Sequence, residues 1–140
     1  MPEQPIVTAE EFAERLAAIA LGGRGSLFPK RPRDRHILYH SMLRAFGVAS
    51  ACSEETVNTN LLRWRSEVAP HLEVDHVTLR RYLVDEGYLV RDADGRSYAV
   101  HPVGRGEVQF DPAIANLDDV AIIEAARSRA AARREQAARR

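Results

Sequence analysis

The chain has 140 residues, of which 45% are hydrophobic and 29% are charged, and its 20 basic and 20 acidic side chains give a formal net charge of zero. This length suits one modest core with extensions at either end, and the composition is that of a folded chain. The apolar runs are too short to span a bilayer and no signal core is evident, so we expect a cytoplasmic protein without a membrane partner. The single cysteine, Cys52, excludes an internal disulfide and a multi-cysteine zinc site.

The charges are sorted along the chain although they sum to zero. Residues 24–46 are basic, and residues 127–140 contain six arginines against Glu135, whereas residues 1–22 and 53–75 are acidic. Locally basic segments favour nucleic-acid binding, whereas the neutral total argues against tight nonspecific binding.

The first predicted element is an amphipathic helix from Ala9 to Leu21. Thr8 followed by Glu11 fits the capping box, in which each side chain bonds the other residue's amide. Apolar side chains follow at helical spacing: Phe12, Leu16 and Ile19. This stripe must cover either the core or a second subunit. Glycines, prolines and basic residues then predict an exposed connector, anchored on the core by Leu27 and Phe28.

Two further helices are predicted over residues 33–46 and 54–69. The first has an apolar stripe and a glycine stop at Gly47. The second has Ser53 as its N-cap and is limited by Pro70, because the residue before a proline avoids the helical region. Its predicted inward side chains are Val57, Leu61, Leu62 and Trp64. We expect one shared core of Leu38, Met42, Leu61, Trp64, Leu79 and Leu83.

A short helix followed by a hairpin is predicted over residues 74–100. Asp75 is the N-cap of a helix over residues 76–86, because its carboxylate can accept the amide of Thr78. Gly87 supplies the left-handed conformation that ends the helix. Two strands joined by the turn at residues 92–95 then form a β-hairpin over residues 88–100.

The predicted fold class is mainly α with a small β-hairpin. Three helices followed by a hairpin give the order of a winged helix-turn-helix, in which the third helix reads DNA. We expect an N-terminal helix and connector in residues 1–26, the winged-helix domain in residues 27–100 and an extension in residues 101–140. The extension contains a short strand from Glu107 to Phe110 and a final Ala/Arg-rich helix capped by Asn116.

Basic and polar side chains of the connector, the third winged-helix helix and the hairpin are the candidate DNA contacts. Those at the start of a recognition helix usually contact bases, and arginines and lysines nearby contact phosphates. The candidates are Lys30, Arg31, Arg33, Arg35, His76, Thr78, Arg81, Arg91 and Arg96. Asp92 and Asp94 make the predicted wing tip acidic, which disfavours its insertion beside a phosphate backbone.

Other charged residues are predicted to form ion pairs within the fold. Arg80 is expected to pair with Asp34 or with an acid of the preceding helix, and Arg81 has Asp85 four residues further along its helix. His36 and His40 share a helix face at metal-chelating spacing, but no third ligand stands at useful spacing, so we expect no metal site.

The motifs of catalysis are not found in the sequence. No Ser-His-acid arrangement, phosphate-cradling glycine loop or rigid pair of carboxylates is evident. We therefore expect no enzymatic activity and no cofactor, and we identify no small-molecule ligand.

The sequence resembles the bacterial domain of unknown function family number 2087 over residues 27–100. The resemblance rests on Phe28-Pro29-Lys30 with Asp34-Arg35, residues 53–58, Thr78 to Asp85, Gly87 to Arg91, Gly95 and Tyr98. Members of that family occur alone or behind winged-helix transcriptional regulators. The resemblance therefore implies a regulatory setting and implies no chemistry.

Two functions remain open on the sequence. The leading hypothesis is a DNA-binding regulator of transcription, which the helix order and the basic segments favour. The alternative is a non-catalytic interaction or sensory module that pairs with itself or another regulatory protein and does not bind DNA. The zero net charge, the Asp85-Glu86 helix end and the acidic wing tip favour that alternative.

Overall fold

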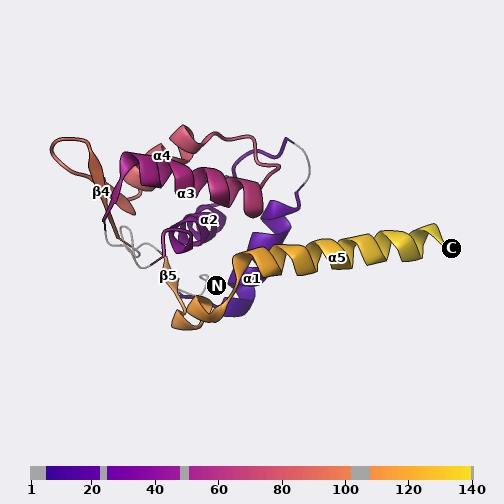
Figure 1. Cartoon of the computed structure of the whole chain (residues 1–140). Coiled ribbons are helices and arrows are strands. Elements are labelled where there is room, and N and C mark those ends of the chain that lie inside the picture. The colour runs from indigo at the N-terminus through magenta and orange to yellow at the C-terminus, as the bar shows by residue number, and fades with distance from the viewer. Residues whose placement is uncertain (1–5, 23–24, 48–50, 102–107, 140) are drawn as a thin grey trace.

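The computed structural model describes residues 6–22, 25–47, 51–101 and 108–139. Within these ranges the chain is mainly helical with a small antiparallel sheet, and α2 lies between α3 and α4 on one side and α1 and α5 on the other (Figure 1). None of the helices in these ranges has the length and apolar character needed to cross a membrane. The elements are β1 (Ile6–Val7), α1 (Ala9–Ala20), α2 (Pro32–Arg44), β2 (Ala51–Ser53), α3 (Glu54–Glu67), α4 (His76–Asp85), β3 (Leu89–Arg91), β4 (Ser97–Val100), β5 (Gln109–Phe110), the 3-10 helix η1 (Pro112–Asn116) and α5 (Asp119–Ala138).

The predicted hairpin is one part of a three-stranded antiparallel sheet. Its strands β3 and β4 pair as expected, with Val90 opposite Ala99. The other edge of β4 pairs with β2, with Cys52 opposite Tyr98, so the strand order is β2-β4-β3. The strand at β2 was not predicted, because three residues are too few to show an alternating pattern.

A second, parallel pair of strands joins segments from the two ends of the chain. In it, β1 pairs with β5, with Val7 opposite Phe110. The predicted strand near Phe110 is therefore present over Gln109–Phe110, while Glu107 lies outside the described residues. Val7 and Phe12 from the first segment and Ile114 and Ile123 from the last belong to the same buried cluster as the central helices.

Three of the predicted helix caps are confirmed. The side chains of Thr8, Ser53 and Asp75 accept the amides of Glu11, Thr56 and Thr78 at 3.1, 3.1 and 2.8 Å. Each bond satisfies a backbone donor that the first helical turn leaves without an intrahelical partner. Gly87 has the left-handed backbone, with φ of 81°, that was expected to end α4.

Two other predictions about helix starts are wrong. The Glu11 carboxylate does not close a capping box, because it pairs with Arg33 of α2. The final helix is capped by Asp118, which accepts the amide of Ala121 at 3.1 Å. Asn116 instead ends the preceding 3-10 helix, so it is two residues too early to cap α5.

The predicted core is confirmed for all six members, which are fully or almost fully buried: Leu38, Met42, Leu61, Trp64, Leu79 and Leu83. Leu62 was wrongly predicted to face inward; it is 46% exposed, because Leu61 and Trp64 already occupy the inner face of α3. Leu27 was expected to anchor the connector but is 72% exposed, whereas Phe28 packs between the rings of Tyr39 and Tyr82.

Candidate nucleic-acid interface

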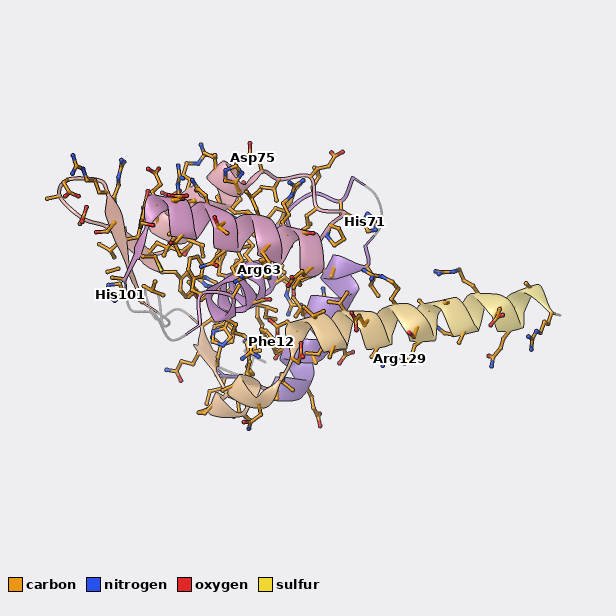
Figure 2. All side chains as sticks on the ribbon, in the orientation of Figure 1. Phe12, Arg63, His71, Asp75, His101 and Arg129 are labelled. Carbon is orange, nitrogen blue, oxygen red and sulfur yellow. The ribbon has the colours of Figure 1, made fainter. Side chains whose placement is uncertain are left out.

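Helix α4 presents one face to the core and the opposite face to solvent. Leu79 and Leu83 are fully buried. Val77, Arg81 and Asp85, which are spaced four residues apart, are exposed and form what we call the outer face of α4. The predicted contacts His76 and Thr78 lie half-buried in the first turn, next to the capping residue Asp75, which lies at the edge of the molecule in Figure 2.

The two adjacent arginines of α4 have different surroundings. The Arg80 guanidinium forms an ion pair with Glu54 of α3 at 3.2 Å, and it donates to the Asn58 side-chain oxygen at 2.5 Å. Arg80 therefore fastens α4 to the start of α3. Arg81 is exposed, and within the described ranges it has no ion pair with Asp85 or with another acid. Its guanidinium lies 6.0 Å from the ring centroid of Tyr82. Because the side chain is exposed and no described acid pairs with it, its charge is available to a ligand.

The basic connector is held beside α4 by an arginine between two aromatic rings. The Arg35 guanidinium lies 4.8 Å from the ring centroids of both Phe28 and Tyr82, and it donates to the Pro29 carbonyl at 3.2 Å. A cation so close to a ring face is attracted by the ring's quadrupole. Arg35 thus has a packing role, and it brings the connector, with exposed Lys30 and Arg31, next to α4.

Two residues of the predicted site are removed from the surface by ion pairs with α1. Arg33 is buried, and its guanidinium donates to both Glu11 carboxylate oxygens at 2.6 and 2.7 Å. The hydrogen bonds from Arg33 lower the pKa of Glu11. Asp34, which was considered as a partner of Arg80, is also buried and instead accepts two bonds from Arg15 at 3.1 and 2.9 Å. Arg33 is therefore not placed to contact DNA, because it holds α1 on α2.

The hairpin has exposed arginines on either side of its turn and negative charge at its tip. Arg91 and Arg96 are exposed, and Arg91 donates to the Gly95 carbonyl at 3.4 Å. Asp92 accepts hydrogen bonds from the Ser97 hydroxyl and from the Arg96 amide. The bond from the Ser97 hydroxyl, together with those from the Ser97 and Arg96 backbone amides, lowers the pKa of Asp92 to about 2. The carboxylates at the tip are therefore negatively charged at neutral pH, and only the arginines that flank them are suited to phosphate contacts.

The two histidines with metal-chelating spacing have separate packing roles. The His36 ring Nδ1 lies 2.7 Å from the Tyr88 hydroxyl. The His40 ring stacks on Phe110 with centroids 4.0 Å apart, and burial lowers its pKa to about 4. Within the described part of the chain, no three histidine, cysteine or carboxylate side chains are grouped as a metal site.

A buried polar network that the sequence did not reveal fastens α5 to α2. The Asp119 carboxylate accepts from the Ser41 hydroxyl at 2.7 Å and from the Arg44 guanidinium at 3.2 Å. The Trp64 ring N–H donates to Ser41 at 2.8 Å, and Arg44 also donates to the carbonyls of Ile114 and Leu117. Ser41 and Asp119 are 78 residues apart, so no local pattern could pair them.

A family model matches residues 26–100, which are more than half of the chain; its description is "Uncharacterized protein conserved in bacteria (DUF2087)". The match has nearly the same limits as the resemblance found in the sequence, and that resemblance is confirmed. No curated protein and no solved structure matches the chain. The matched residues run from the connector through α2, α3 and α4 to the end of β4, and the chain belongs to this bacterial family of uncharacterized proteins, DUF2087.

Proposed function

We propose that residues 27–100 form a winged helix that binds DNA and regulates transcription in the cytoplasm, with α4 as the recognition helix. The order helix, strand, two helices and hairpin supports this, because it continues the helix order expected of that fold. The strand β2, which was not predicted, fixes the hairpin against the start of α3, where Glu54 also binds Arg80 of α4. The proposal assigns no catalytic step and needs no cofactor.

The observation that carries the proposal is that Arg81, at the centre of a well-anchored helix, faces outward and forms no ion pair in the described part of the chain. Leu79 and Leu83 in the core and Arg80 on α3 fix the rotation of α4, so Arg81 points away from the domain. A recognition helix needs this arrangement, in which rigid packing on one face presents a few polar side chains on the other.

Each remaining candidate then has a role in the proposed complex. Arg81 contacts a base edge in the major groove, where arginine pairs well with guanine. His76 and Thr78 lie in the first turn, at the end of a recognition helix that usually meets the bases. Lys30 and Arg31 of the connector, and Arg91 and Arg96 of the hairpin, contact phosphates.

A second candidate function is favoured by the mixed character of the same surface. The outer face of α4 ends in Asp85 and includes Val77, which is 48% exposed, and the hairpin tip carries Asp92 and Asp94. Exposed apolar and acidic groups suit a protein partner better than a phosphate backbone. In this alternative the fold is an interaction module that does not bind DNA.

A genome-wide binding experiment on the unmodified protein tests the proposal without any guess about the target site. We expect discrete enriched DNA segments, and the purified protein should shift a duplex taken from them. The variant Arg81→Ala should bind that duplex with less sequence discrimination. Arg139→Ala is the matched control, because Arg139 is an exposed arginine that follows the end of α5, the helix that projects away from α4 (Figure 1). No enriched DNA, together with no shift of random duplex at low salt, would favour the interaction module.

A further inference from the structure

The last helix, α5, extends well beyond the side chains that hold it. It spans Asp119–Ala138, 20 residues or about 30 Å at 1.5 Å per residue. Its buried side chains are Ile123 and Ala126, and after them only Ala130 is as much as half-buried. Residues 127–138, which we call the overhang, project away from the domain (Figure 1). An isolated helix of that length is marginal in water, so packing against another surface would stabilise it.

A groove of about 970 Å³ lies between α1 and α5. Seven of its sixteen lining residues are alanines, including Ala13, Ala18, Ala121 and Ala125. Small side chains let helix backbones approach to about 8 Å, the short end of the usual interaxial range. The groove therefore has the shape to accept a further helix, and that helix needs small residues where it contacts the alanines.

The overhang itself has such a surface. The buried positions Ile123 and Ala126 are continued at alternating spacings of four and three residues by Ala130, Arg133 and Ala137. This is the spacing of the contact seam between two paired helices. The seam that packs within the domain thus continues, mostly as alanine, along the half of α5 that the domain does not cover.

The charges at the groove and on the overhang are complementary. Glu10 and Glu14 line the α1 side of the groove and are exposed, and no ion pair involves them among the described residues. The other acid and the arginine of that helix, Glu11 and Arg15, are paired with α2. The overhang contains four arginines and one glutamate, and two of the arginines, Arg129 and Arg133, line the α5 side.

We propose that the occupant of the groove is the overhang of a second copy of this chain. Two α5 helices lie antiparallel about a two-fold axis, and each overhang fills the other subunit's groove. Its arginines then meet Glu10 and Glu14 of the other α1. Such a contact is isologous, so it closes as a dimer in which each pairing of an arginine with a glutamate occurs twice. This inference is independent of DNA binding by α4.

The test uses full-length charge variants, with mass measured by light scattering or sedimentation across protein concentration. The wild-type chain should be a dimer. Glu14→Arg and Arg133→Glu should each weaken self-association about tenfold, because like charges then oppose each other at two symmetric places. An equimolar mixture of the two variants should recover the dimer, since opposite charges face each other at both places in the mixed pair.

The mixture distinguishes a contact between chains from one within a chain. If Glu14 and Arg133 interact only within their own subunit, mixing would recover nothing, and this result would overturn the proposal. Glu55→Arg is the matched control, because Glu55 is an exposed glutamate on α3; its dimer should be unchanged. All variants should keep the cooperative unfolding of the wild type, because Glu14, Arg133 and Glu55 are exposed. The variants that dissociate should lose only the helical signal of the overhang, which no longer packs on a second copy.

A second variant tests the shape of the groove without changing charge. Ala125 is exposed on the groove surface, so Ala125→Trp should leave the fold intact and block the groove, giving a monomer. A dimer that persists in Ala125→Trp would show that the second copy does not bind in this groove. A wild-type chain that stays monomeric up to high concentration would refute the second copy as occupant. If that monomer lost DNA affinity on Arg133→Glu, the overhang would be assigned to nucleic acid instead.

Discussion

The two sides of the domain use their basic side chains in different ways. On the side of α2 that faces the end segments of the chain, Arg33 and Arg44 are bound to Glu11 and Asp119 and hold α1 and α5 in place. On the side formed by α4 and the hairpin, Arg81 and Arg96 are exposed, and in the described ranges neither forms an ion pair. An arginine of this chain is therefore available to a ligand only where no distant acid pairs with it in the fold.

The largest expected effect is the loss of a structural arginine. Arg44→Met removes the cation beside the largely buried Asp119 and three hydrogen bonds to α5, η1 and the loop between them. We expect the free energy of unfolding in urea to fall by about 2 to 4 kcal/mol, because a buried carboxylate would lose its partner. Arg81→Met is the matched substitution at an exposed position and should change it by less than about 0.5 kcal/mol. If the free energy of unfolding fell equally in both variants, Arg44 would be no more important to the fold than the exposed Arg81.

The second expected effect is a dependence of folding stability on pH that is caused by His40. This residue lies on the side of α2 that faces the end segments of the chain, where its ring contacts Phe12 and Phe110. Burial lowers the pKa of His40 in the folded protein to about 4 from its ordinary value of 6.5, so between these values the unfolded chain binds the proton more readily. The stability due to His40 should be complete above pH 6.5 and fall as the pH drops towards 4. The total loss should be about 3 to 4 kcal/mol, because the two pKa values differ by about 2.5 units and each unit corresponds to about 1.4 kcal/mol.

His40→Phe isolates that contribution, because phenylalanine keeps the ring stack on Phe110 but cannot be protonated. Urea unfolding of the wild type and of the variant should be measured at several pH values between 4 and 7. The stability of His40→Phe relative to that of the wild type should increase as the pH falls, because only the wild type loses stability by protonation at this position. A constant difference would show that His40 does not titrate in this range.

A smaller effect is expected for Arg81 and concerns DNA binding. Arg81→Ala should reduce discrimination between target and altered duplexes by about 1 to 3 kcal/mol, because one base contact is lost. Arg80→Ala provides a comparison on the same helix. It should lower the free energy of unfolding by about 0.5 to 1 kcal/mol, since Glu54 is partly exposed, and should leave discrimination unchanged. If Arg80→Ala reduced the discrimination between duplexes and Arg81→Ala did not, Arg80 and not Arg81 would be the residue that contacts a base.

The smallest effect is expected for the connector and is independent of DNA sequence. Changing Lys30 and Arg31 together to alanine should weaken binding to all duplexes alike and reduce the slope of log affinity against log salt by about 2 units, because two phosphate contacts are lost. Affinities should be measured by fluorescence anisotropy at several salt concentrations. A loss confined to one target sequence would contradict a phosphate role.

Local chemistry predicted most of the helical framework. The caps at Thr8, Ser53 and Asp75 and the buried positions Leu79 and Leu83 are signalled by residues within a few positions of each other. The order of helices and hairpin, and the family, could be predicted for the same reason.

Features that depend on partners distant in sequence could not be predicted. The pairing of β1 with β5 joins residues about a hundred positions apart, and the bond between Ser41 and Asp119 spans 78. In the candidate site, the sequence did not distinguish Arg33 and Arg35 from Lys30, because all three are basic and lie within six residues of each other. Only the folded positions of Glu11 and of the Tyr82 ring separate the arginines that pack from the lysine that remains exposed.

The most direct test of DNA binding by α4 is to locate the DNA-binding surface on the intact protein. Backbone amide shifts of the isotopically labelled chain should be followed by NMR as a short duplex is added at low salt. We predict that the shifts concentrate on residues 76–85 of α4, on Lys30 and Arg31 and on the strands of the hairpin, and that residues 9–20 of α1 are unaffected. Shifts confined to the arginines of α5, or no shifts at all, would contradict the claim that the outer face of α4 binds DNA.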